Sequence, residues 1–157
     1  MNTLFEMQSE DDLRRHAIAE NQTNVHRILI GEGPWALSER QRKILECLRG
    51  RQGRALAMTI AELQEKVGGG PREIKADVRD LVMSFRLAIV ASRDGADGGY
   101  YFATTTQERV EGSENYLQEA IKLLQRVAII RNQPDILRGL GQQLLDAPEG
   151  DAPSWHN

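Results

Sequence analysis

The sequence has few of the residues that build metal centres or disulfide frameworks. It contains a single cysteine, Cys47, which cannot form an intramolecular disulfide; we expect its thiol to be buried and inert on an apolar helix. The three histidines, His16, His26 and His156, lie far apart and match no metal-ligand spacing. We therefore expect no metal site.

Long apolar runs are also lacking. No stretch approaches the ~20 apolar residues of a membrane span, and the first residues show no basic region followed by an apolar run. We expect a cytoplasmic protein without a membrane partner.

Nucleotide-binding signatures are absent from both glycine clusters. Residues 68–70 are not followed by the Lys-Ser/Thr of a P-loop, and residues 95–99 do not fit a dinucleotide fingerprint. They are better explained as a helix stop and a hairpin tip. We expect no enzymatic activity and no cofactor.

Charge is distributed unevenly along the 157 residues. The net charge is −3 and the pI about 5.7, which argues against nucleic-acid binding. Residues 38–104, however, hold 12 basic and 9 acidic side chains, a net of +3, whereas the flanks hold 8 basic and 14 acidic, a net of −6. The acidity belongs to the flanks, and the central segment is basic.

Residues 1–37 are expected to form a helical N-terminal arm. Ser9 with Asp12 predicts a helix start, and the helix is expected to run to about Glu20. A second apolar patch covers residues 25–30, before glycine and proline break the pattern. The sequence leaves open whether this arm packs on the central segment or on a partner protein.

Two capping boxes open the central segment, residues 38–104. Ser38-x-x-Gln41 predicts a helix ending near Gly50, and Thr59-x-x-Glu62 predicts a short helix stopped by the glycines at 68–70. Between them, residues 55–58 are short and apolar enough for a small edge strand.

Residues 71–85 predict a third helix, with Pro71 at its first position. Its apolar stripe consists of Ile74, Val78, Leu81, Val82 and Phe85. A basic side consists of Arg72, Lys75, Arg79 and Arg86, and an acidic side of Glu73, Asp77 and Asp80. Taken alone, such charges are more often a solvated surface than a binding site.

The segment after this helix changes that balance. Residues 88–92 and 100–102 are β-prone and flank a glycine-rich tip, residues 93–99, which predicts a hairpin. Helix, turn, longer helix and hairpin is the order of a winged helix-turn-helix. We therefore expect a mostly α fold with a small antiparallel β wing and flanking helices.

The residues from Ser38 to about Ala103 resemble winged helix-turn-helix domains of the biotin-repressor and deoxyribonucleoside-repressor types. The resemblance rests on Thr59-Ile-Ala-Glu-Leu, on Val78-Arg-Asp-Leu and on Ser92-Arg93 with Gly98-Gly-Tyr-Tyr. The long C-terminal helix is also similar to small winged-helix proteins of phages and prophages. The resemblance implies binding of double-stranded DNA.

Carried over by position, the resemblance implies that Arg72, Lys75, Ala76 and Arg79 face the major groove and that Arg93 lies on the wing. One departure is the start of the recognition helix, where such families often have Ser or Thr and this chain has Gly70-Pro71. The backbone N–H groups there could still bind a phosphate.

Residues 105–146 predict C-terminal helices. Thr105-x-x-Glu108 opens a helix that we expect to reach about Asn132, with a soft point at Gly112. Its broad apolar face predicts either packing on the chain's own core or a homodimer. The dimer residues would be Tyr116, Leu117, Ile121, Leu124 and Ala128. A further amphipathic helix is expected after Pro134, and residues 147–157 are expected to be disordered.

Taken together, these features favour a sequence-specific transcriptional regulator of bacterial or phage type. Two alternatives stay open. One is a winged-helix module that binds proteins and not DNA, since fold alone does not determine function. The other is an accessory factor in nucleic-acid processing, such as replication or packaging.

Overall fold

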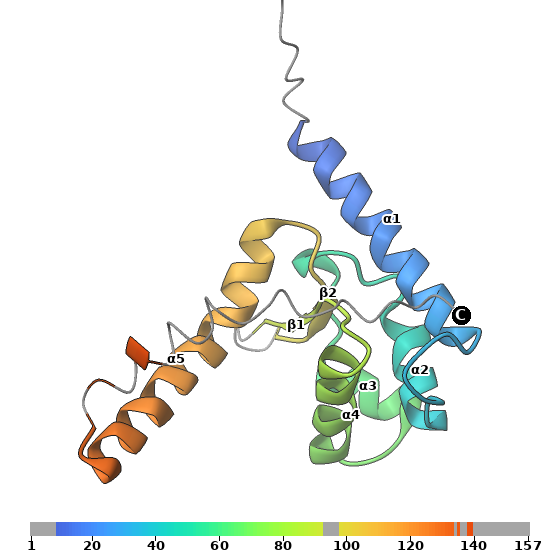
Figure 1. Cartoon of the computed structure of the whole chain (residues 1–157). Helices are drawn as coiled ribbons and strands as arrows, with labels where there is room; N and C mark the ends of the chain where they lie inside the picture. Colours follow the sequence, from blue (N-terminus) through green and yellow to red (C-terminus); the bar gives the residue numbers. More distant parts are fainter. Residues whose placement is uncertain (1–8, 93–97, 134, 136–137, 140–157) are drawn as a thin grey trace, which may run out of the picture. The chain divides into compact units, whose positions relative to one another are not determined.

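The computed structural model describes residues 9–92, 98–133, 135 and 138–139. The chain divides into two compact units, Met1–Gly112 and Ser113–Asn157. The described elements are mostly helical, with one small antiparallel sheet, as the sequence predicts (Figure 1). None of the helices in the described ranges is both long enough and apolar enough to cross a membrane.

Three helices form the centre of the first unit: α2 (Glu39–Leu48), α3 (Ile60–Val67) and α4 (Pro71–Met83). Both predicted capping boxes are confirmed, because Ser38 and Thr59 each accept a backbone hydrogen bond while Gln41 and Glu62 reach back. The three helices contact one another in every pairing. Their buried side chains are Ile44, Leu45, Leu48, Leu63, Ile74, Val78 and Leu81.

The sheet consists of β1 (Ile89–Ala91) and β2 (Tyr100–Phe102), paired antiparallel with Val90 opposite Tyr101. On its other edge β2 bonds to the segment before α3 through single bridges at Gln52 and Met58. The prediction of an edge strand at residues 55–58 is wrong. Residues Arg54–Leu56 form a 3₁₀ turn, η1, which allows the chain to touch β2 only before and after the turn.

The base of the hairpin is held by a close backbone approach at Gly99. A Cβ at this position would lie 2.4 Å from the carbonyl oxygen of Met58, so only glycine fits. The Ser92 N–H donates to the Gly99 carbonyl at 2.8 Å, which joins the two arms of the wing. The predicted tip, residues 93–97, lies outside the described residues.

The N-terminal helix α1 (Glu10–Leu29) is longer than the sequence predicts. Ser9 caps it as expected, but the helix continues past Glu20 because its second half packs on the central helices and buries Val25 and Ile28. Buried Asn21 donates to Gln52 Oε1 at 3.0 Å and to the Ala103 carbonyl at 3.1 Å. This half of the arm therefore packs on its own chain, while its first turns stay exposed.

The last helix, α5 (Thr106–Arg131), begins as predicted, with the Glu108 N–H donating to Thr105 Oγ1 at 3.1 Å. The Glu108 carboxylate accepts from the Thr104 N–H at 2.7 Å and from the Arg54 N–H at 2.8 Å. Burial alone would raise the pKa of Glu108, but these backbone donors outweigh it and the pKa is lowered. Glu108 thus fastens the first turn of α5 to η1.

Gly112 is not the soft point that the sequence predicts. A Cβ on Gly112 would lie 2.6 Å from Val90 Cβ, so the glycine allows α5 to lie directly against β1. The boundary between the two units follows this residue.

The second unit begins with the remainder of α5, in which no side chain is fully buried. Tyr116 and Leu117 are more than half exposed, and Ile121, Leu124 and Ala128 are partly exposed. All of the apolar residues on which the prediction of a further helix after Pro134 rests, and the tail at 147–157, lie outside the described residues.

We predict that Gly112→Ala destabilises the protein by about 1–3 kcal/mol, the usual cost of an overpacked contact. In an open helix the same change would stabilise by about 1 kcal/mol, so the sign of the effect tests the contact with Val90. Urea unfolding measures it, with Gly50→Ala as the control, because nothing lies within 4 Å of a Cβ at Gly50. Val90→Gly removes the Cβ and both methyl groups that a Cβ at position 112 would meet, so it should cost less stability in the Gly112→Ala background than alone. A stabilising Gly112→Ala would contradict the packing.

Candidate nucleic-acid interface

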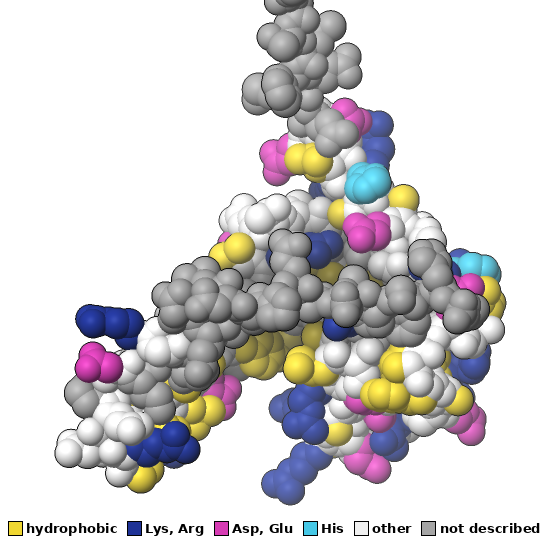
Figure 2. Space-filling model, in the orientation of Figure 1, with side chains coloured by type: hydrophobic (Ala, Val, Ile, Leu, Met, Phe, Trp, Pro, Cys, Tyr) yellow, Lys and Arg dark blue, Asp and Glu magenta, His cyan; other side chains and the backbone are white. Residues whose placement is uncertain are grey.

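Helix α4 exposes one continuous polar face. Arg72, Lys75, Ala76 and Arg79 are all exposed, and their spacings of 3, 1 and 3 place them on one side of the helix. The opposite side is buried in the core. Figure 2 shows Lys and Arg side chains projecting from the part of the molecule where α4 lies in Figure 1. We call these four residues the outer face of α4.

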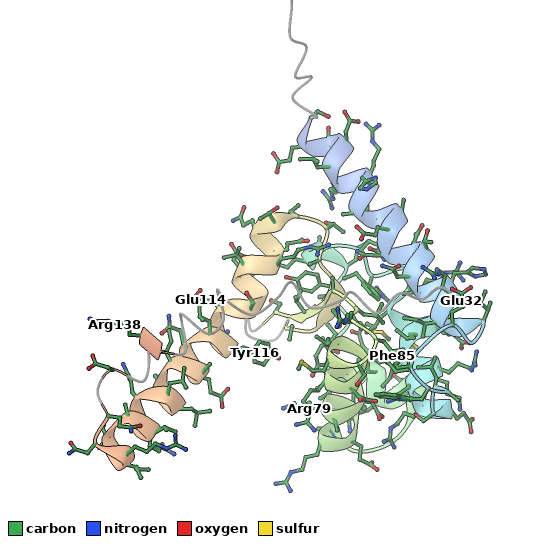
Figure 3. All side chains as sticks on the ribbon, in the orientation of Figure 1. Glu32, Arg79, Phe85, Glu114, Tyr116 and Arg138 are labelled. Atoms are coloured by element: carbon green, nitrogen blue, oxygen red, sulfur yellow. The ribbon has the colours of Figure 1, made fainter. Side chains whose placement is uncertain are left out.

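The cations of the outer face form no ion pair with the described residues. Within the described ranges, no acidic side chain lies within ion-pair distance of Arg72, Lys75 or Arg79. Arg79 extends from α4 on the side away from α2 (Figure 3). Their positive charge is therefore available to an external anion.

The acidic side of α4 is bound to α2. Arg40 forms ion pairs with Asp77, through Nε, and with Glu73, at 3.3 Å. Gln41 Nε2 donates to Asp80 Oδ2 at 2.7 Å. The hydrogen bond to Asp77 raises the pKa of Arg40. The acidic residues are thus occupied within the module and do not share the outer face.

The start of α4 is already occupied by a carboxylate. The Gly70 N–H donates to Glu73 Oε2 at 2.8 Å, and this bond, followed by the charge of Arg40, lowers the pKa of Glu73. An ionised carboxylate stands at this helix start, where the sequence left room for a phosphate. Phosphate binding at the Gly70 N–H is therefore disfavoured, and the side chains of the outer face become the candidates for DNA contact.

Arg86 does not belong to the outer face, which corrects the predicted basic side. Helix α4 ends at Met83, and Arg86 adopts a left-handed backbone with φ of 55° in the connection to β1. Phe85 also lies beyond the helix, where it is buried and packs edge-on against Trp35 with ring centroids 5.6 Å apart. The predicted wing contact, Arg93, lies outside the described residues.

Arg40 is the positioning residue that sequence reasoning missed. Its partners lie 33 and 37 residues away, so no local pattern links them. The sequence predicts separate acidic and basic sides on α4. It does not indicate which of the two sides packs against α2.

No metal-binding group emerges in the described part of the chain, where no three His, Cys, Asp or Glu side chains come together. Cys47 is only half-buried, less than expected, and packs at the margin of the core.

We predict that Arg40→Ala lowers the free energy of unfolding, because it leaves the mostly buried Asp77 carboxylate without its charged donor. Lys43→Ala is the matched control on the same helix: its ion pair with Glu39 is exposed and should contribute much less to stability. Denaturant unfolding compares the two variants. Adding Asp77→Ala and Arg40→Ala/Asp77→Ala completes a double-mutant cycle that gives the coupling between Arg40 and Asp77. Equal effects of Arg40→Ala and Lys43→Ala would contradict a positioning role.

The chain was also compared with known proteins. No protein-family model, curated protein or solved structure matches the chain.

Proposed function

We propose that this protein binds double-stranded DNA by placing the outer face of α4 in the major groove, as a sequence-specific transcriptional regulator of bacterial or phage type. The observation that carries the proposal is a set of exposed cations, Arg72, Lys75 and Arg79, that no acidic side chain of the described residues pairs with. They lie on the second helix of a helix-turn-helix that a wing follows. Arginine and lysine side chains read guanine edges and bind phosphates.

The orientation of α4 supports this proposal over a merely solvated charged surface. The core fixes one side of the helix and Arg40 with Gln41 fixes the acidic side. Both constraints turn the cations outward together, on one rigid helix, which is the geometry that groove binding needs. A surface that serves only solubility would not need the acidic side chains of the same helix to be paired with residues of α2.

The net charge of −3 does not contradict this function, because the binding surface is local. Each neutralised phosphate contributes roughly 0.9 to the slope of log affinity against log salt. Three cations give a slope of about −3 for one module. Binding should therefore be moderate and strongly salt-dependent.

We predict that Arg72→Ala/Lys75→Ala/Arg79→Ala abolishes DNA binding and leaves thermal stability nearly unchanged. Each base-contacting side chain should contribute about 1–3 kcal/mol, and each phosphate contact about one unit of salt slope. Fluorescence anisotropy with a labelled duplex at several salt concentrations measures both quantities.

The control variant is Arg14→Ala/Arg15→Ala/Arg109→Ala, which removes the same charge from exposed positions on α1 and α5. It should bind DNA as the unchanged protein does. If the α4 variant binds equally well, this face is not the DNA site; if the unchanged protein binds no duplex, a protein-interaction module is favoured. Selection from a random-sequence pool then separates a specific regulator, which enriches one motif, from a processing factor, which enriches none.

A further inference from the structure

The part of α5 beyond Gly112 carries apolar side chains that the described residues leave exposed. Leu117 is 54% exposed, and Ile121, Leu124 and Ala128 are partly exposed. Soluble proteins seldom leave such an extended apolar surface in water unless it binds something. Figure 3 labels Glu114 and Tyr116 on this part of the helix.

Six residues of α5 follow a heptad seam with spacings of 3, 4, 3, 4 and 3. They are Glu114, Leu117, Ile121, Leu124, Ala128 and Arg131. The four central members are apolar and the two end members carry opposite charges. Such a seam is typical of a two-stranded coiled coil, in which knobs of one helix enter holes of the other.

The seam is complementary to itself when two copies run antiparallel. With the midpoint between residues 122 and 123, Leu117 lies opposite Ala128 and Ile121 opposite Leu124 of the second copy. Every apolar layer then combines a Leu with an Ala or an Ile. A parallel pairing would instead place Ala128 opposite Ala128 and leave that layer underfilled.

Charge selects the same orientation and the same register. In the antiparallel register Glu114 lies opposite Arg131 of the second copy at both ends of the seam. A parallel pair would place Glu114 beside Glu114 and Arg131 beside Arg131, which is repulsive. In an antiparallel pair the two helix dipoles also point in opposite directions, which is electrostatically favourable.

We propose that the chain forms an antiparallel homodimer through this seam of α5, with Glu114–Arg131 pairs closing both ends. The occupant of the apolar stripe is thus a second copy of α5. The two Gly112 residues would lie about 30 Å apart along the helix pair, at 1.5 Å per residue. That separation is close to the ~34 Å between half-sites one DNA turn apart; only this last comparison rests on the proposed function.

Spin-label distances on the full-length protein test the orientation without DNA. In a Cys47→Ser background, single cysteines replace Asn115, Lys122 or Ile129, three exposed positions seven residues apart on one side of α5. The antiparallel dimer gives a short distance at position 122 and distances with an added axial separation of roughly 20 Å at 115 and 129. Three equal distances would show a parallel pair, and no dipolar signal a monomer; either result overturns the proposal.

Charge reversal tests the register. Glu114→Arg and Arg131→Glu should each raise the dimer Kd about tenfold, because both end pairs become repulsive. The double variant should restore the original Kd. Glu119→Arg and Arg126→Glu, on the outer side of the helix, are the matched controls and should change little. Analytical ultracentrifugation measures the Kd, and circular dichroism checks that each variant keeps its helices.

Two results would overturn the proposal. A full-length chain that stays monomeric at tens of micromolar, an ordinary range for weak dimers, would mean that the stripe is covered within its own chain, residues 134–146 being the segment available for it. A dimer unaffected by either single reversal would place the interface elsewhere. Neither result bears on DNA binding by α4, which is measured separately.

Discussion

The rest of the molecule depends on one constraint: helix α4 is held in a fixed orientation about its own axis. Burial of Ile74 and Leu81 fixes one side of the helix, and the ion pairs of Arg40 with Asp77 and Glu73 fix a second. The third side then has to face solvent, and it carries the cations. A shift of one residue in this helix would turn Arg79 toward the core and expose apolar side chains, so stability and surface chemistry are determined by the same contacts.

Features encoded by neighbouring residues could be predicted from the sequence. The capping boxes at Ser38 and Thr59 lie within three residues of their partners, and both are present in the structure. The order of helices and the hairpin followed from local periodicity and turn residues. The exposed positions of the outer face of α4 followed from the phase of its apolar stripe.

Features set by distant contacts could not be predicted. Helix α1 runs through Asn21, Thr23 and Asn24, which have low helix propensity, because its packing on α2 compensates for that propensity. Gly112 resembles a weak point in sequence, yet it marks close contact with Val90. The role of Arg40 depends on residues more than thirty positions away. Each of these needed the tertiary structure.

The proposed DNA binding has to be reconciled with the charge distribution, in which the central module is basic and the flanks are acidic. A single module offers three unpaired cations on α4, which is a modest surface beside a net charge of −3. Linking two such modules makes the second contact intramolecular, and affinity then rises without any new residue at the interface. The salt dependence would double for the same reason, since counterion release counts all neutralised phosphates. If both proposals hold, the apolar seam of α5 and the outer face of α4 act together, because association compensates for the small number of charges that each copy can present.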